Sequence, residues 1–287
     1  MGTQVRRMRL FSRDARRPGR LVYVAPELPE ADRAALAQRL EAPVIFSDAL
    51  DIERASADIR GPDGKPVALP DACFAAYRVL VEADKAPLKR LRFMAPEGEV
   101  QVQGEYFRPT QSAQIWREAP TPTVRSLEGD VLGPALGPLL GLEVQDVLSA
   151  SEVVTPGVGS TVVVLLKDLA ACAKANVGHG VATWAKAQGV PAGVPWVLHS
   201  AEASVPLFDG HVRVVRPGEG AVVDGSLAAT ALVVHWTRAP RQMAFNAELG
   251  DGKAVVGQVA VWVEGEPGAP ERLSIGGHVL DEGEVEL

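Results

Sequence analysis

The stretch His211–Trp236, HVRVVRPGEGAVVDGSLAATALVVHW, predicts the unit from which the fold is built. It predicts a strand over His211–Arg216, a Pro-Gly turn, and an apolar helix that opens at Asp224-Gly225-Ser226. A small polar residue at a helix start accepts hydrogen bonds from free backbone N–H groups, and the helix dipole favours an anion there. The stretch therefore predicts a place for a carboxylate or phosphate at the helix N-terminus.

A second copy of this pattern lies in the first half of the chain. A strand over Ala57–Arg60 and a Gly-Pro-Asp-Gly turn precede an Ala-rich apolar helix that has Asp71 at its start and runs to about Asp84. A weak internal repeat of this kind indicates two similar lobes. We expect one aspartate from each lobe, Asp71 and Asp224, to face a shared cleft.

Length and proline content predict two domains. The chain has 287 residues, more than a single domain usually contains. The segment Ala119–Thr123 holds two prolines, which suppress both helix and sheet, and is the best linker candidate. We predict an N-terminal lobe over residues 1–118 and a C-terminal lobe over residues 119–287, whose last strand can pack back on the first lobe.

The remaining elements predict an α+β fold. Antiparallel strand signals alternate with one long central helix in each half. Among the expected elements are a helix from Glu30 that ends at Pro43, a central strand over Thr161–Leu166, and a closing hairpin of Val255–Val263 and Arg272–Val279. The basic cluster that begins at Arg6 is interpreted as a solvated edge rather than a targeting signal, because no apolar segment follows it.

Charge and cysteine content exclude several classes of partner. The net charge of -7 argues against nucleic acid or an anionic membrane, since both need a basic face. Cys73 and Cys172 are too few and too isolated for a disulfide framework or a zinc site, so we expect a reducing cytoplasm and no metal. Neither Gly157-Val158-Gly159 nor Gly218-Glu219-Gly220 completes a dinucleotide fingerprint, so no NAD site is predicted.

Several fragments occur in an order typical of one known family. They are Val153–Gly157 before the central strand, Arg213–Gly218, Gly225–Ala228, Ile275–Val279 and the terminal Glu282–Leu287. These resemble, in the same order, the Ser-Thr-Gly turn, the Arg-Met-Phe-Ala-Pro-Gly strand, the Thr-Gly-Ser-Ala helix start, the Gly-Gly strand and the Glu-Gly-Glu-Leu end of the phenazine-biosynthesis isomerase family (PhzF-like proteins). The resemblance extends over nearly the whole chain.

This resemblance implies the diaminopimelate epimerase-like fold, with two pseudo-symmetric lobes. Each lobe would be a curled, mostly antiparallel sheet around a central helix, with a ligand between the two helix N-termini. It also implies a homodimer and a cofactor-free proton transfer on a small acid, with one acid and one base. Helix N–H groups that bind the substrate carboxylate would stabilise the charge that develops when a C–H proton leaves.

The sequence departs from the family at its acid–base positions. The family's catalytic Glu aligns with Ala42, its His with Asp71 and its Asp with Ala221. Asp224 falls immediately before Gly-Ser, where the cysteine-using epimerases of this fold carry a catalytic thiol. Two carboxylates in a closed apolar cleft can hold different protonation states and act as an acid and a base. Asp71 and Asp224 are therefore the candidate catalytic residues.

Four further residues are candidates for substrate binding: Ser226, Gly225, Cys73 and Arg213. Arg213 is expected to point towards an anionic ligand, and Arg216 towards solvent. Each assignment has a structural alternative. Helix capping alone explains an Asp at either helix start, and Cys73 fits the small core residue of an Ala-rich helix face.

Together these observations predict a cofactor-independent isomerase-like enzyme that acts on a small biosynthetic metabolite. The expected reaction is a double-bond shift, an epimerisation or a rearrangement. A rearrangement suits a site without strong bases, because it depends more on shape and desolvation than on proton abstraction. The alternative is a non-catalytic binding or scaffold protein that keeps the fold and has lost the chemistry.

Overall fold

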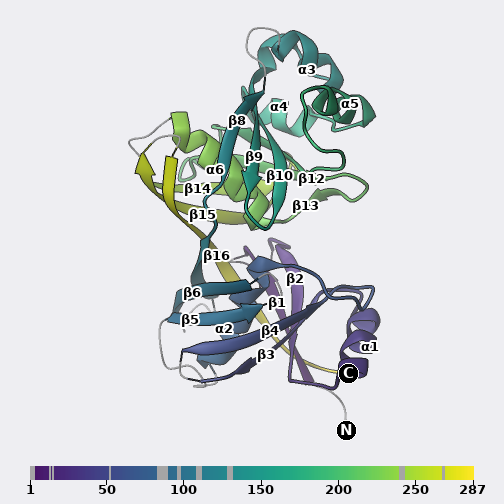
Figure 1. The fold of residues 1–287 in the computed structure, drawn as a ribbon, viewed down its shortest axis with the longest axis vertical. Coiled ribbons are helices and arrows are strands. Elements are labelled where there is room, and N and C mark those ends of the chain that lie inside the picture. Colours follow the sequence, from purple (N-terminus) through teal and green to yellow (C-terminus); the bar gives the residue numbers. More distant parts are fainter. Residues whose placement is uncertain are drawn as a thin grey trace. The chain divides into compact units, whose positions relative to one another are not determined.

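The computed structural model describes residues 4–12, 14, 16–51, 53–82, 90–95, 98–107, 112–127, 132–238, 243–266 and 269–287. The chain divides into two compact units (Figure 1). We call Met1–Glu118 with Gly276–Leu287 the N-lobe, and Ala119–Ile275 the C-lobe. Each unit combines strands with a few helices, which confirms the predicted α+β class.

The N-lobe is a sheet with two helices. Its strands are β1 (Gln4–Leu10), β2 (Arg20–Ala25), β3 (Val44–Ala49), β4 (Arg54–Arg60), β5 (Arg90–Ala95), β6 (Gly98–Phe107), β7 (Ser112–Ala119) and the end of β16 (Ala269–Glu286). Pairing is parallel in β2–β3 and β4–β5, and antiparallel in β1–β2, β3–β4, β5–β6 and β6–β7. The end of β16 pairs antiparallel with β1, so the last strand belongs to the first lobe.

Helix α2 (Cys73–Glu82) is the central helix of the N-lobe. It follows a short 3₁₀ turn, Pro70–Ala72, and contacts β1, β2, β3 and β6. A helix that is buried nearly all round belongs inside a core, and the sheet curls around this one (Figure 1). Its buried residues are Cys73, Phe74, Ala75, Ala76, Tyr77, Arg78 and Leu80.

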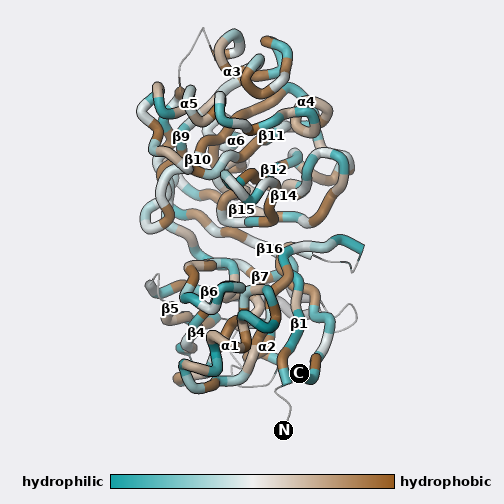
Figure 2. The backbone as a smooth tube through the Cα atoms, turned by 90° about the vertical axis from the view of Figure 1, so that its right-hand side faces the viewer, coloured by the Kyte–Doolittle hydropathy of each residue, from teal (hydrophilic) through white to brown (hydrophobic). Residues whose placement is uncertain are grey.

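The C-lobe contains more helices. Its strands are β8 (Thr123–Leu127), β9 (Val147–Thr155), β10 (Gly159–Leu166), β11 (Trp196–Ser200), β12 (Gly210–Arg216), β13 (Gly220–Val222), β14 (Ala244–Gly250), β15 (Val255–Glu266) and the beginning of β16. Its helices are α3 (Leu132–Leu140), α4 (Leu169–Lys174), α5 (His179–Ala187) and the central α6 (Gly225–Arg238). Figure 2 shows hydrophobic stretches in the strands around α6, which contacts β10, β11, β12, β14 and β15.

The two lobes share one pairing pattern. From β1 to β6 the pairs run antiparallel, parallel, antiparallel, parallel and antiparallel. From β9 to β15 they run in the same order, through β9–β10, β10–β11, β11–β12, β12–β14 and β14–β15. In both, the central helix lies in the connection between the strands of the second parallel pair, α2 between β4 and β5 and α6 between β12 and β14.

The outer faces of the two sheets, opposite the central helices, are covered differently. In the N-lobe, α1 (Glu30–Leu40) packs a small cluster that includes Leu36, Val44 and Phe46. In the C-lobe, α3, α4 and α5 bury a much larger apolar cluster, which includes Leu136, Cys172, Val181, Trp196 and Leu198.

The first part of the basic N-terminal segment is β1, which pairs with both β2 and β16 and is therefore not an edge strand, whereas Arg16 further along the segment is exposed. Val5, Met8 and Leu10 of β1 are buried because both faces of the strand are covered: Val5 packs in the cluster under α1, and Met8 and Leu10 lie on the opposite face. Arg6 pairs with Glu82 of α2 at 2.6 Å and with Asp281 of β16 at 2.5 Å. The positive charge therefore attaches the first strand to the last strand and to the central helix.

The linker is shorter than predicted. Ala119 and Thr123 belong to β7 and β8, and only residues 120–122 lie outside the strands. The sequence pattern missed β8 and β9, whereas it located the Thr161–Leu166 strand and both strands of the closing hairpin. The predicted end of the first central helix, near Asp84, lies outside the described residues.

Two glycines let β16 pass close to aromatic rings in the N-lobe. A Cβ at Gly276 would lie 2.7 Å from the Trp116 ring, and a Cβ at Gly277 would lie 2.6 Å from the Phe11 ring. Both distances are too short for carbon atoms in contact. The Gly-Gly pair noted in the sequence therefore has a packing role. Among the helices that the structure describes, none is long and apolar enough to cross a membrane.

Candidate active site

In the N-lobe, Asp71 lies in the 3₁₀ turn that leads into α2. It is 1% exposed, and its Oδ1 accepts a hydrogen bond from Nε of Arg117 at 2.9 Å. Arg117 comes from β7 and is 4% exposed. This is a charge-assisted bond between a carboxylate and a guanidinium. The N-lobe thus places a buried, ion-paired carboxylate at the start of its central helix.

Cys73, the first residue of α2, has a local role. Its thiol donates a hydrogen bond to the carbonyl oxygen of Pro70 at 2.8 Å, and the side chain is buried. This contact closes the turn that carries Asp71. The structure therefore favours the packing interpretation of Cys73, and a substrate contact remains a prediction.

In the C-lobe, Asp224 precedes α6 and caps it. Its Oδ1 accepts a hydrogen bond from the N–H of Leu227 at 2.9 Å, which is the geometry of an N-cap residue. Its Oδ2 accepts a second bond from Nη2 of Arg216 at 2.7 Å. Gly225 is buried and Ser226 is half-buried in the first turn of the helix. Both carboxylate oxygens of Asp224 are therefore engaged.

Arg216, which is expected from the sequence to point towards solvent, is half-exposed and bonds to Asp224. The side chains of Arg213 and Arg216 lie on opposite faces of β12, because the residues are three apart in a strand. Arg213 donates from Nη1 to the carbonyl oxygens of Cys172 and Ala175, at 3.2 and 2.8 Å, and so satisfies the end of α4. The contacts of Arg213 thus assign it a structural role, and its predicted substrate contact lacks support from them.

The positions that align with the family's other acid–base groups carry no ionisable side chain. Ala42 is buried just after α1, and Ala221 is exposed in β13. Any acid–base chemistry in this chain therefore has to use other side chains, such as those of Asp71 and Asp224.

The two arginine partners were absent from the sequence prediction. Arg117 could have been found from strand alternation, because Ile115 is buried and Arg117, two residues on, faces the same side. Arg216 could have been found in the same way from Val212 and Val214. A charged residue at a core-facing position needs a partner of opposite charge, and Asp71 and Asp224 are those partners.

Three of the histidines lie together in the C-lobe core, on β11, β12 and α6. His199 is buried, with Nε2 at 3.3 Å from Nδ1 of His235. His211 accepts a bond from the N–H of Gly252 at its Nε2, so its Nδ1 carries the proton and points to Glu248 at 3.5 Å. These contacts connect strands and loops, and the His199 and His211 side chains have no side open to solvent.

Cys172 is the buried cysteine of the C-lobe. Burial raises the pKa of its thiol to about 12. A thiol that stays protonated is a poor nucleophile, so Cys172 is a core residue, as the sequence indicates. Within the described ranges, no group of three or more His, Cys, Asp or Glu side chains is placed to hold a metal ion.

Comparisons with known proteins agree on the fold. No family model and no curated protein sequence matches the chain. The structure of the Bacillus anthracis phenazine biosynthesis protein of the PhzF family aligns over 100% of this chain and 99% of that chain, with a TM-score of 0.79 and 16% identity. A predicted epimerase from Pseudomonas aeruginosa aligns over 99% of both chains, with a TM-score of 0.73 and 13% identity.

A more distant likeness extends to another class of epimerase. A hydroxyproline epimerase from Agrobacterium vitis, with bound trans-4-hydroxy-L-proline, aligns over 99% of this chain and 90% of that chain, with a TM-score of 0.54 and 11% identity. These identities are low, so the likeness concerns the course of the backbone. The chain therefore has the PhzF-like fold that its sequence fragments predict.

Proposed function

We propose that the protein is a cofactor-independent isomerase-like enzyme that acts on a small biosynthetic metabolite, with Asp71 and Asp224 as its catalytic carboxylates. One observation carries this proposal. At the start of its central helix, each lobe holds a buried aspartate that is paired with an arginine, Arg117 or Arg216. Helix capping explains the aspartates alone, but it does not require an arginine at either one.

The ion pairs narrow the reaction class. An epimerisation that uses two bases needs one group protonated and one ionised, on opposite sides of the reacting carbon. Both aspartates carry a guanidinium partner, which suits the charged carboxylate in each lobe. We therefore favour a double-bond shift in which one carboxylate removes a proton from carbon and returns it to another carbon of the same substrate.

The test is deuterium exchange. The protein is incubated in deuterated water with small amino, hydroxy and dienoic acids, and deuterium at carbon is measured by mass spectrometry. We expect uptake with at least one unsaturated acid, and a loss of at least about a hundredfold in its rate in Asp71→Asn or Asp224→Asn, the scale of general-base catalysis. Asn still caps a helix, so the Asp224 variant should stay folded.

Asp63→Asn is the matched control, because Asp63 is exposed in a turn of the N-lobe. Exchange that persists in both site variants would contradict the assignment of the two carboxylates. Binding of an acid by calorimetry without any exchange would favour a rearrangement catalyst or a non-catalytic binding protein.

A further inference from the structure

The two adjacent glycines of β16, Gly276 and Gly277, face opposite sides of the N-lobe sheet. Successive residues of a strand point to opposite faces, and β16 lies between β1 and β7 in this sheet. Neither glycine is in the left-handed backbone region that favours glycine, yet a Cβ at either would lie less than 3.0 Å from an aromatic ring. The constraint at both positions is therefore space.

Gly276 lies against the strand that carries Arg117. Its Cβ would lie 2.7 Å from Cε3 and 2.8 Å from Cδ2 of Trp116. Trp116 precedes Arg117 in β7, and Arg117 donates from Nε to Asp71 Oδ1 at 2.9 Å. Because the indole ring is rigid, a methyl group at Gly276 would displace the ring or the β7 backbone next to Arg117.

Gly277 lies against the helix that follows Asp71. Its Cβ would lie 2.6 Å from Cδ1 of Phe11 and 3.3 Å from Cε2 of Phe74. The two phenyl rings are in edge contact, with centroids 5.8 Å apart and planes at 66°. Phe74 lies in the first turn of α2, just after the 3₁₀ turn that holds Asp71. A methyl group at Gly277 would therefore press through both rings on the start of α2.

Phe11 has little freedom to move away from such a methyl group. It is fully buried and has a φ of 62°, which is unusual for a bulky residue. The next residue, Ser12, is also buried, and its hydroxyl donates to the carbonyl oxygens of Asp14 at 2.9 Å and Arg17 at 2.8 Å. A backbone conformation of this kind persists only where the surrounding structure holds it in place. The displacement would therefore pass to α2.

We propose that Gly276 and Gly277 are positioning residues, which set the geometry of the Asp71–Arg117 ion pair through the three aromatic rings that they contact. A catalytic group has to be held within about 0.5 Å of its productive position. Carbon atoms in contact are about 3.5–4.0 Å apart, so relief of either close contact needs a shift of at least this size. The expected effect on turnover rests on the proposed function, whereas the geometry of the ion pair can be measured without a substrate.

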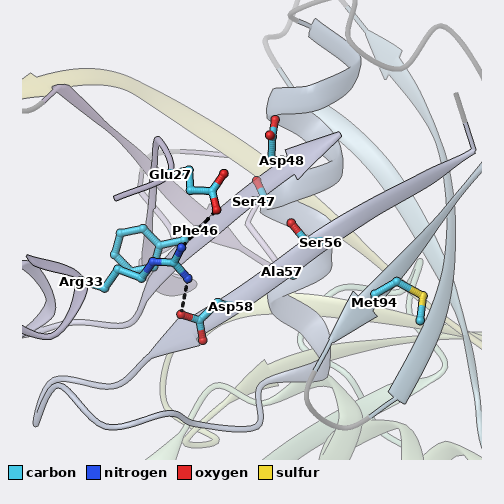
Figure 3. A pocket seen from close by; sticks show the side chains of 9 residues that line it. All are labelled: Glu27, Arg33, Phe46, Ser47, Asp48, Ser56, Ala57, Asp58 and Met94. Carbon is cyan, nitrogen blue, oxygen red and sulfur yellow. Dashed lines mark hydrogen bonds and ion pairs between the residues drawn. The ribbon is translucent and has the colours of Figure 1, made fainter. Parts of the chain in front are cut away.

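The side of the N-lobe sheet near α1 has the room that the two glycines lack, and it supplies a control position. A pocket of about 300 Å³ is formed there by β3, β4 and β5 with α1 and the segment before it (Figure 3). Arg33 lies at one end of the pocket, where it donates to Asp58 at 2.9 Å and to Glu27 at 3.3 Å. Ser56 of β4 lines the pocket, so a methyl group added at Ser56 enters open space in the same lobe.

This pocket is open because the connection from β3 to β4 is short. Residues 50–53 make this connection, whereas residues 201–209 make the corresponding one from β11 to β12 in the C-lobe. The longer loop is bound to the C-lobe sheet by Glu248, which accepts from the N–H of Ser204 at 2.8 Å, its hydroxyl at 2.7 Å and the N–H of Val205 at 3.1 Å. A shorter connection covers less of the sheet, which leaves Ser56 beside the pocket.

The first measurement needs no substrate. Gly276→Ala and Gly277→Ala are compared with Ser56→Thr, which adds one methyl group in the pocket. The Nε–H signal of Arg117 in ¹⁵N NMR spectra, assigned by its loss in Arg117→Lys, reports the hydrogen bond to Asp71. We expect this signal to shift in both glycine variants and its proton to exchange with water about tenfold faster or more, because a hydrogen bond to a charged group is weakened. Ser56→Thr should leave it unchanged.

The second measurement is rescue by a compensating change. Phe11→Ala removes the ring that a methyl group at Gly277 meets, so Phe11→Ala/Gly277→Ala should bring the Arg117 signal back to that of Phe11→Ala alone. In the deuterium exchange assay, Gly277→Ala should lower kcat about tenfold to a hundredfold with little change in KM, as expected for a displaced catalytic group. The double variant should recover part of this loss.

Thermal unfolding shows which variants are folded, and if Gly277→Ala does not fold, Gly276→Ala and the double variant carry the test. The positioning role is overturned if the Arg117 signal of the folded glycine variants is that of the wild type, or if Ser56→Thr changes it equally. Unchanged turnover in these variants, in a protein that does exchange deuterium, would overturn it as well. A wild type without deuterium exchange would contradict the proposed function alone, since the Arg117 signal still tests the geometry.

Discussion

The N-lobe and the C-lobe pair their strands in one order, yet they differ at the helix start and on the outer face. The N-lobe aspartate is held by a fully buried arginine, and the C-lobe aspartate by a half-exposed one. The N-lobe outer face carries one helix and an open pocket, whereas three helices and a long loop cover that of the C-lobe. The pairing order therefore sets where a site can form, and loop length with side-chain identity determines what is there.

The largest expected effect concerns the buried ion pair. Arg117→Met removes the guanidinium and leaves the Asp71 carboxylate buried without it, which should cost about 3–5 kcal/mol of unfolding free energy. Chemical denaturation with a probe in each lobe would measure this loss. Because the pair lies within the N-lobe, the loss should appear in the transition of that lobe.

The double variant Asp71→Asn/Arg117→Met is the control for this interpretation. It removes both charges, so it should recover part of the lost stability. A double variant as unstable as Arg117→Met would show that the arginine contributes through packing and not through its charge.

The second prediction concerns the loop that closes the C-lobe face. Ser204→Ala removes one hydrogen bond to the buried Glu248 carboxylate and should cost about 1.5–3 kcal/mol. Ser56→Ala, on the open N-lobe face, should change stability by no more than about 0.5 kcal/mol. Equal effects of the two changes, measured by thermal unfolding, would remove the distinction between a closed and an open face.

The positions of the two aspartates could be predicted from sequence, because an Asp before an Ala-rich apolar helix is a local signal. The arginine partners could not be predicted from the repeat. Arg60 and Arg216 both end a strand before a Gly-containing turn, but Arg60 bonds to Glu30 and Asp58 on the α1 side. Arg216 faces the central helix instead. A shift of one residue in a strand exchanges its two faces, and the repeat pattern does not reveal such a shift.

The strand β1 was missed for a related physical reason. Its apolar residues Val5, Met8 and Leu10 do not share one face, because Val5 packs in the cluster under α1 and Met8 and Leu10 lie on the other side of the strand. Its arginines also form ion pairs with Glu82 and Asp281, which are far away in sequence. Partners so distant in sequence cannot be deduced from local composition. The N-lobe pocket cannot be deduced either, because it depends on how short the connection between β3 and β4 is.

The third prediction uses pH to compare the cores. Burial raises the pKa of Cys172 from its ordinary value of 9.0 to about 12. The unfolded chain loses this proton first, so the stabilisation is complete below about pH 9 and is lost as the pH rises towards 12, by up to about 1.4 kcal/mol per pH unit. Cys172→Ala should remove this dependence, and Cys73→Ala, at the N-lobe helix start, should retain it. Unfolding curves at several alkaline pH values measure the difference.

The smallest expected effect is that of Arg216→Met, the counterpart of the first prediction. The Arg216 side chain is 38% exposed, so water solvates its guanidinium group in the wild-type protein. In the variant, water can solvate the edge of the Asp224 carboxylate that the guanidinium leaves. Such pairs contribute about 0–1 kcal/mol, and the cap from Asp224 to Leu227 remains. Denaturation should therefore detect little change, while the deuterium exchange proposed above should fall if Arg216 positions the carboxylate, with partial recovery in Arg216→Lys. A loss of stability as large as that of Arg117→Met would mean that the two ion pairs are equivalent and that exposure does not distinguish the lobes.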